Sequence, residues 1–175
     1  MPTTPIINTT SGETVSRESM ILYLNTGTTS TPVWSPIGKR VSDSSMELDW
    51  STNTEQDILG DTYTTAKKPV ITQSFDPYKL DSGDAALSKL YDLAVLQHNA
   101  QALCNLDCLV VHFYSGDTST PFAERYPASA IVITSLGGEG GGDLEGAFDV
   151  TYGGTRAVGT ASKGTGGAIT FTPAA

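Results

Sequence analysis

The sequence predicts a mainly β protein in which two antiparallel sheets pack together, as a sandwich or barrel-like sheet, with one flanking α-helix. Apolar residues make up 38% of the 175 residues and charged residues only 17%, so Ser, Thr and Gly fill the difference. That composition is typical of short strands joined by many turns. Only one stretch, about residues 83–99, has a helical apolar period, whereas several short stretches have the character of strands. A chain of this length is expected to form one domain.

The chain begins with a polar segment. Residues 1–19 are rich in Thr, Ser and Pro and have no apolar period, so we expect an extended arm ahead of a single domain at 20–175. The run MILYLN at 20–25 predicts the first strand. The later run SSMELDW alternates apolar and polar residues and ends at Trp50, which is typical of a half-exposed strand.

A long polar loop is predicted at 51–68. It contains one apolar pair, Ile58 and Leu59, and it ends in two adjacent lysines, Lys67 and Lys68. The apolar run PVITQSFD follows directly and predicts a further strand, because proline is tolerated at a first strand position. The densest positive charge of an acidic chain therefore lies where this strand begins.

The helix at 83–99 is the most regular element of the sequence. Asp81 or Ser82 can cap it by accepting a backbone N–H, and His98 is placed to help end it. Its apolar residues are spaced by three or one, which places them on one face. These residues are Leu87, Leu90, Tyr91, Ala94 and Val95.

After the helix the sequence returns to strands. CLVVHFY is apolar enough to be a central strand, and ASAIVITSLG follows it after a loop bounded by proline. GGEGGGD reads as a flexible connector, and GAFDVTY alternates strictly. The tail at 158–175 is rich in Gly and Thr and ends in the short strand AITFTP.

The net charge limits the partners of the protein. A formal charge of −9 and a pI near 4.4 argue against a sequence-independent grip on nucleic acid, which needs an excess of Lys and Arg. They argue equally against docking on anionic lipid. No apolar run approaches the length of a membrane span, and the N-terminus lacks the pattern of a signal peptide, so we expect folding in a reducing cytoplasm.

The residues of common active sites do not form a recognisable pattern here. Cys104 and Cys108 make no CxxC pair, and with only His98 and His112 beside them we predict no metal site. The glycine run GGEGGGDLEG carries carboxylates that would repel a phosphate, and GTASKGTGG lacks the ending of a P-loop. No GxSxG surrounds any serine. The sequence therefore predicts no enzyme and no cofactor.

Several segments between Trp34 and Tyr114 resemble the major tail tube proteins of long-tailed bacteriophages. In chain order they are WSPIGKR, ELDWSTNTEQDILGDTYTTAKKP, TQSFDP, the helix DAALSKLYDLAVLQHN and LVVHFY. A second matching piece is GAFDVTYGGTR with ITFTP near the C-terminus. The likeness lies in the order of these segments, which cover most of the chain, and not in an invariant motif. The tube proteins of contractile tails and of type VI secretion systems look similar at this level.

The resemblance implies a virion structural protein. It implies hexameric rings whose inner sheets join into a continuous barrel, and rings that stack into a tail tube assembled in the host cytoplasm. The implied partners are other copies of the chain, a tape-measure protein and tail-tip or terminator proteins. DNA would pass through the tube without specific binding, which an acidic protein favours because it repels phosphate.

The resemblance also implies that the long loop reaches a neighbouring subunit or ring. Lys67 and Lys68 would then anchor it against acidic surface such as Asp43, Glu47 or Asp49 of another copy. The alternative is that both lysines are simply solvated at a strand end, where ion pairs contribute little.

The apolar pair in the loop suggests burial against something, either another copy or the protein's own sheet. The candidate inter-subunit contacts are therefore Trp50, Ile58, Leu59, Lys67 and Lys68.

Two other functions remain open from the sequence. A type VI secretion tube protein shares the fold that the resemblance implies. A secreted carbohydrate-binding or adhesive β-sandwich should expose a row of aromatic side chains, and Trp34 and Trp50 are too few and too separated to form one.

Overall fold

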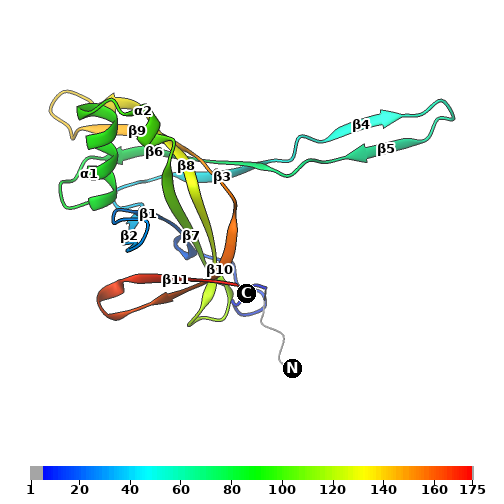
Figure 1. Ribbon diagram of the computed structural model, residues 1–175, viewed down its shortest axis with the longest axis horizontal. Coiled ribbons are helices and arrows are strands. Elements are labelled where there is room, and N and C mark those ends of the chain that lie inside the picture. The colour runs from blue at the N-terminus through cyan, green and yellow to red at the C-terminus, as the bar shows by residue number, and fades with distance from the viewer. Residues whose placement is uncertain (1–5, 175) are drawn as a thin grey trace.

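Two antiparallel sheets share one long strand in the computed structural model, which describes residues 6–174 (Figure 1). The strands are β1 (Met20–Asn25), β2 (Trp34–Ile37), β3 (Ser44–Asp49), β4 (Asn53–Gln56), β5 (Thr62–Thr65), β6 (Val70–Lys79), β7 (Leu106–Gly116), β8 (Pro121–Gly137), β9 (Glu145–Thr151), β10 (Ala157–Lys163) and β11 (Ile169–Pro173). The helical elements are α1 (Ala85–Tyr91), the π-helical η2 (Asp92–Leu96), α2 (Ala100–Leu103) and two 3-10 turns, η1 (Arg17–Ser19) and η3 (Thr165–Gly167).

The shared strand is β8. Its first half pairs with β7 on one side and with β10 on the other, whereas residues 130–137 pair with β9. One sheet therefore contains β2, β1, β7, β8, β10 and β11, and the other contains β8, β9, β6 and β3. This confirms the prediction of two antiparallel sheets, and they do not close into a barrel.

The main core lies between the two sheets. Cys108 and Val110 on β7 point into it, and Phe75 and Phe148 from the second sheet stack there with ring centroids 4.6 Å apart. Tyr78 meets the Phe148 ring edge-on at 5.3 Å. Each of these side chains is at most 2% exposed, so the two sheets bury their apolar faces against each other at the centre of the molecule.

A second, smaller core covers the opposite face of the first sheet. Leu109 and Val111 on β7 point into it, and the β10–β11 hairpin covers them with Ala161 and Ile169. Strand β7 is therefore buried on both faces. This explains why CLVVHFY is uniformly apolar and does not alternate.

The predicted helix is present with different ends. It begins at Ala85, because the Asp84 side chain caps it by accepting from the Leu87 N–H at 3.0 Å, and not at Asp81 or Ser82. Leu87 and Leu90 bury its inner face in the main core.

The second half of that helix is irregular. It continues as the π-helical turn Asp92–Leu96 and is interrupted before Asn99, whose side chain caps the short α2. His98 lies at the interruption with a φ of 50°. The predicted helix end near this histidine is correct, but no feature of the sequence indicates the π turn, and its cause is not evident in the residues.

The prediction of an irregular loop at 51–68 is wrong. Strands β4 and β5 pair in register from Asn53 with Thr65 to Gln56 with Thr62, and they form a two-stranded hairpin. The hairpin continues β3 and β6 outward, away from both sheets (Figure 1). Every side chain on β4 and β5 is exposed. The arm is held by its backbone pairing, by hydrogen bonds between exposed side chains such as Thr54 and Thr64 at 3.0 Å, and by the sheet at its root.

The polar N-terminal segment has no strand and no α-helix within residues 6–19. It is tied to the first sheet through Asn8. The Asn8 backbone N–H donates to the Tyr114 carbonyl at 2.8 Å, and its side-chain amide donates to the Phe113 and Gly116 carbonyls at 3.0 and 3.2 Å.

The stacked aromatic pair gives a first test. Because Phe148 is completely buried, Phe148→Ala is expected to lower the free energy of unfolding by about 3–5 kcal/mol. Val132→Ala, on the exposed face of the same sheet, is the matched control and is expected to change it by about 0.5 kcal/mol or less. Urea unfolding measures both. Equal losses would contradict the placement of the core.

Candidate inter-subunit surface

The arm ends in an exposed apolar tip. Ile58 is fully exposed and Leu59 is 83% exposed, in the turn between β4 and β5. The Asp57 carboxylate holds this turn, because it accepts from the backbone N–H groups of Leu59 and Asp61, both at 2.9 Å. The apolar pair is therefore presented by an ordered turn, and it is not buried against the protein's own sheet.

The exposed pair is a large apolar surface for one turn. Burying an Ile or Leu side chain is worth about 1.5–3 kcal/mol, so covering both would contribute about 3–6 kcal/mol. An exposed apolar cluster rimmed by polar residues is typical of an interaction site.

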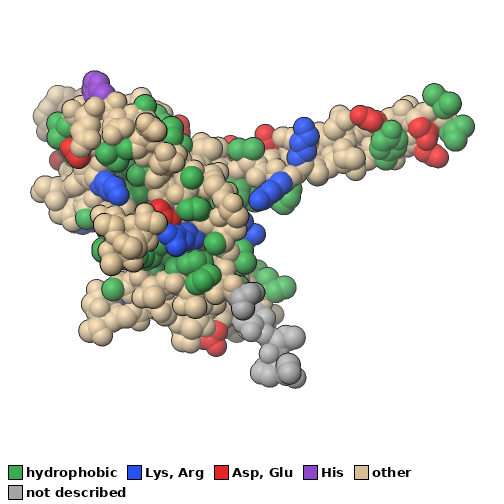
Figure 2. All heavy atoms as spheres, in the orientation of Figure 1, with side chains coloured by type: hydrophobic (Ala, Val, Ile, Leu, Met, Phe, Trp, Pro, Cys, Tyr) green, Lys and Arg blue, Asp and Glu red, His purple; other side chains and the backbone are tan. Residues whose placement is uncertain are grey.

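The tip is also acidic. The hairpin carries Glu55, Asp57 and Asp61, and it has no Lys or Arg between residues 53 and 65. Figure 2 shows the hydrophobic side chains at the far end of the arm with acidic side chains beside them, and basic side chains nearer the root.

The other candidate residues lie at the root of the arm. The Lys67 N–H donates to the Trp50 carbonyl at 2.9 Å. This hydrogen bond joins the outgoing and returning segments of the arm where the arm leaves the sheet. Trp50 is half exposed, and Lys68 is exposed beside it. No carboxylate in residues 6–174 lies within ion-pair distance of Lys67 or Lys68. The structure thus brings Trp50 and Lys68 together and places the tip far from them.

A groove of about 780 Å³ opens at this root, and we call it the root groove. Its apolar lining comes from the start of β1, from β3 and the residue after it, and from the start of β6. These residues are Met20, Met46, Leu48, Trp50, Pro69 and Ile71. Leu48 and Trp50 are each about half exposed. Three cations also line it, Arg17, Lys68 and Arg156.

The polar floor of the root groove is built around Glu124. Tyr126 donates to its carboxylate at 2.7 Å, Arg156 forms an ion pair with it, and His112 lies 3.9 Å away. Burial alone would raise the pKa of Glu124, but these three neighbours outweigh it and lower this pKa to about 2. Burial and then Glu124 raise the pKa of Tyr126, so the floor carries one carboxylate paired with one guanidinium.

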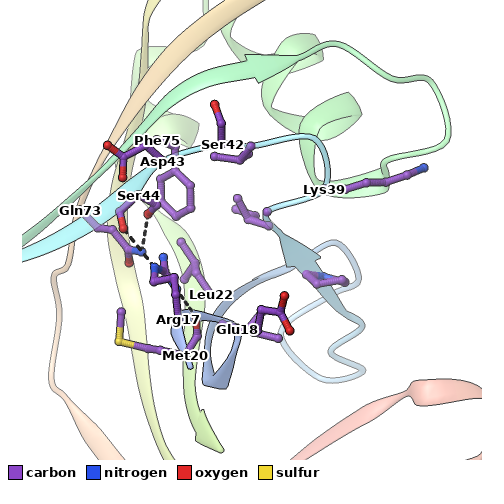
Figure 3. Close-up of a pocket in the computed structure, with 15 residues that line it drawn as sticks. Arg17, Glu18, Met20, Leu22, Lys39, Ser42, Asp43, Ser44, Gln73 and Phe75 are labelled. Atoms are coloured by element: carbon purple, nitrogen blue, oxygen red, sulfur yellow. Dashed lines mark hydrogen bonds between the residues drawn. The ribbon is translucent and has the colours of Figure 1, made fainter. Parts of the chain in front are cut away.

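A second groove of about 410 Å³ continues along the open flank between the two sheets, and we call it the flank groove. Figure 3 shows Arg17 between β1 and β3, where its guanidinium donates to the Ser44 carbonyl at 3.2 Å and to the Met20 carbonyl at 2.7 Å. Arg17 lines both grooves and so divides them. Leu22 and Phe75 form part of the apolar wall of the flank groove.

The second sheet has one buried and one exposed face. The strand register places Glu47, Asp49 and Asp149 on the exposed face, among Ser, Thr, Ala and Val. Lys79, at the end of β6, is the one Lys or Arg on this face of β3, β6, β9 and residues 130–137 of β8, all of which the structure describes, and it is paired with Asp143 at 2.9 Å and with Glu145 at 3.5 Å. The face therefore carries an excess of negative charge among small side chains.

The same sheet has two unpaired edges. Its strand order ends at β3, and residues 130–137 of β8 pair only with β9 in the described part of the chain. Unpaired strand edges are templates for pairing with another chain.

The sequence analysis missed the Glu124 cluster and the role of Arg17. His112 lies on β7, Glu124 on β8 and Arg156 just before β10, so no local spacing indicated this cluster. Arg17 lies in the polar segment that was expected to be an extended arm.

Within residues 6–174, no group of three or more His, Cys, Asp or Glu is arranged to hold a metal ion. Cys104 is exposed and Cys108 is buried, and burial raises the pKa of Cys108 to about 12, which suppresses the reactive thiolate. No helix among residues 6–174 is long and apolar enough to cross a membrane.

Comparisons with known proteins identify the fold. No family model matches the sequence, and no curated protein matches it. Among solved structures, the chain is similar to the sheath/tube terminator of an extracellular contractile injection system, with a TM-score of 0.52 and 10% identity over 85% of this chain and 99% of that chain. It is also similar to the tube-terminating cap of the anti-feeding prophage, with a TM-score of 0.50 and 9% identity over 87% and 95%.

At such low identity the likeness shows the fold alone. The chain has a tail-tube-like fold, of the kind found in components of contractile injection systems.

The Glu124 cluster gives a prediction on pH. Because the folded pKa lies near 2, below the ordinary value of 4.5, the charged carboxylate stabilises the fold above pH 4.5 and this stabilisation is lost as pH falls toward 2. Glu124→Gln is expected to lower the melting temperature at pH 7, and its gap to wild type should narrow below pH 4.5. Glu139→Gln, in the exposed loop after β8, is the control and should show no gap. A gap for Glu124→Gln that is constant with pH would contradict this assignment.

Proposed function

We propose that this protein is a virion structural subunit that forms hexameric rings, and that these rings stack into a tail tube. The observation that carries the proposal is the second sheet, which has two unpaired edges and an exposed acidic face. The tail-tube-like fold supports it.

Edge pairing would close the ring. If β3 of one copy pairs with residues 130–137 of β8 in the next, the four-stranded sheets continue from subunit to subunit without an unpaired edge. Such a contact joins two different surfaces of each copy, and it generates a ring when the rotation closes. The number six comes from the resemblance to tail tube proteins.

The exposed face of that sheet would line the channel. Six copies would place Glu47, Asp49 and Asp149 in repeated rows along the wall, and the one cation of this face, Lys79, is already paired with Asp143 and Glu145. Such a wall repels phosphate, so DNA can slide past without being held. In this proposal the tube is a conduit for genome delivery and has no enzymatic role.

The arm would join one copy to another. Its tip residues, Ile58 and Leu59, are too exposed to be useful to the isolated subunit, and Trp50, Lys67 and Lys68 surround its root. The proposal includes a tape-measure protein inside the tube, tail-tip and terminator proteins at its ends, and assembly in the host cytoplasm.

A tube terminator is the second candidate function. The two solved structures reported above are described as a terminator and a terminating cap, and this chain covers 99% and 95% of them. A terminator would form one ring and stop, whereas a tube subunit would stack many rings. Negative-stain images of the assembled protein therefore distinguish the two functions, because they show whether rings remain single or stack.

The assembly test uses the apolar tip. Concentrated wild-type protein is expected to form rings and stacked tubes in negative-stain images, with a chemical cross-linking ladder that ends at six. Ile58→Ser combined with Leu59→Ser should block stacking without changing the melting temperature, because neither side chain is buried in the subunit. Wild-type protein that remains monomeric at every concentration would contradict the proposal. A loss of thermal stability in the variant would place the tip in the subunit's own core.

The channel wall is tested with DNA. Assembled tubes are expected to leave the mobility of duplex DNA unchanged at low salt, where any electrostatic attraction is strongest. The matched variant Glu47→Lys with Asp149→Lys reverses two charges on the exposed face and should make tubes retard DNA in a salt-sensitive way. Retardation by wild-type tubes would overturn the repulsive channel.

A further inference from the structure

We infer that the root groove of one copy receives the arm tip of a second copy. This inference rests on the proposed function in assuming that copies associate, and it adds the surface that receives the arm. Neither the tip nor the groove is satisfied within one chain in the described structure: the tip is an exposed apolar turn, and the groove is an open apolar hollow beside three cations.

The tip cannot reach the groove of its own chain. Trp50, at the root, and Ile58, at the tip, are eight residues apart along a paired, extended hairpin, which spans about 26 Å at 3.3 Å per residue. Folding back would require breaking the β4–β5 pairing and the turn that Asp57 holds. The occupant must therefore come from another molecule.

The groove fits the tip in apolar character. Leu48 and Trp50 are about half exposed at its mouth, and Met46 and Ile71 line its wall. Methionine and tryptophan side chains give an adaptable and broad apolar surface, which suits a branched pair such as Ile58 and Leu59. The volume of about 780 Å³ lies within the range of ordinary binding pockets.

The charges of the two surfaces are complementary. The tip carries three carboxylates and no cation. The root groove carries Arg17, Lys68 and Arg156 against the single carboxylate of Glu124, which Arg156 already pairs. The lysine that no carboxylate in residues 6–174 neutralises, Lys68, would meet an acidic residue of the tip such as Asp61.

The flank groove is a weaker match for the tip. Its rim carries Arg17 and Lys39 but also Glu18 and Asp43, so its charges balance. Lys39 is moreover already paired with Asp81 at 2.8 Å. An acidic tip therefore favours the root groove.

The contact joins two different surfaces, so it propagates. Each copy has one tip and one groove, and a copy whose tip is engaged still offers its groove to another. The arm holds the two surfaces about 26 Å apart, and this length sets the offset between successive copies. The root groove lies next to the unpaired edge of β3. The contact of the tip with the groove and the pairing of strand edges therefore use the same side of the subunit.

Site-specific cross-linking tests the contact directly. A photoreactive phenylalanine at position 58 of the full chain, mixed with isotope-labelled wild-type protein, is expected to cross-link between copies to the segment 44–50 or 68–71. Cross-links only to segments that do not line the root groove, such as residues 36–43 of the flank groove or the β10–β11 hairpin, would overturn the inference, while rings and tubes in the same sample would leave the proposed function standing. Cross-links to the root groove in a sample without rings would support the inference and contradict the proposed function.

Exchanging the charges of Lys68 and Asp61 tests the same contact through the strength of association between copies. Lys68→Glu is expected to weaken association between copies at least tenfold, measured by sedimentation, and so is Asp61→Lys. The double variant should restore it, because the pair is re-formed with reversed signs. Lys163→Glu is the control: it makes the same charge change at an exposed lysine that does not line the root groove, and it should leave association unchanged. Equal loss in Lys163→Glu and Lys68→Glu, or no rescue in the double variant, would overturn the inference.

Discussion

The burial of β7 on both faces is the constraint on which the rest of the structure depends. Val110 faces the main core and Leu109 faces the smaller core, so one strand holds the two-sheet body and the β10–β11 hairpin together. Because both faces of β7 are covered, the centre of the first sheet has no exposed face. The exposed face and the unpaired edges belong to the second sheet, which is why assembly is assigned to it.

The long strand β8 connects the two sheets, because it belongs to both. Its first half is bound on both sides by β7 and β10, and its second half leaves that sheet to pair with β9. The outer edge of residues 130–137 is consequently free, at the far side of the second sheet from the free edge of β3. The position of one shared strand thus creates the two edges that a ring would join.

The arm shows how stability and assembly are divided within the chain. Its strands bury no side chain, so the hairpin adds little to the stability of the subunit, and its exposed tip disfavours the isolated state. Apolar surface left uncovered in one copy becomes binding energy when a second copy covers it. The Glu124 cluster has the opposite role, because its ion pair and hydrogen bonds fix the floor of the root groove before any partner arrives.

The sequence by itself determined the fold class, the approximate position of most strands, the helix around Leu87 and Leu90, and the unusual apolar pair in a polar segment. These follow from local periodicity and composition, which need no knowledge of distant residues. Only the tertiary structure decided that residues 51–68 form a paired arm, since polar β4 and β5 have no apolar period and are held by backbone hydrogen bonds. Only the tertiary structure decided that Arg17, Lys68 and Arg156 line one groove. Their proximity depends on how η1, the segment before β6 and the segment before β10 meet in space. Periodicity reports which side of an element is buried, whereas the pairing of distant strands reports which surfaces become neighbours.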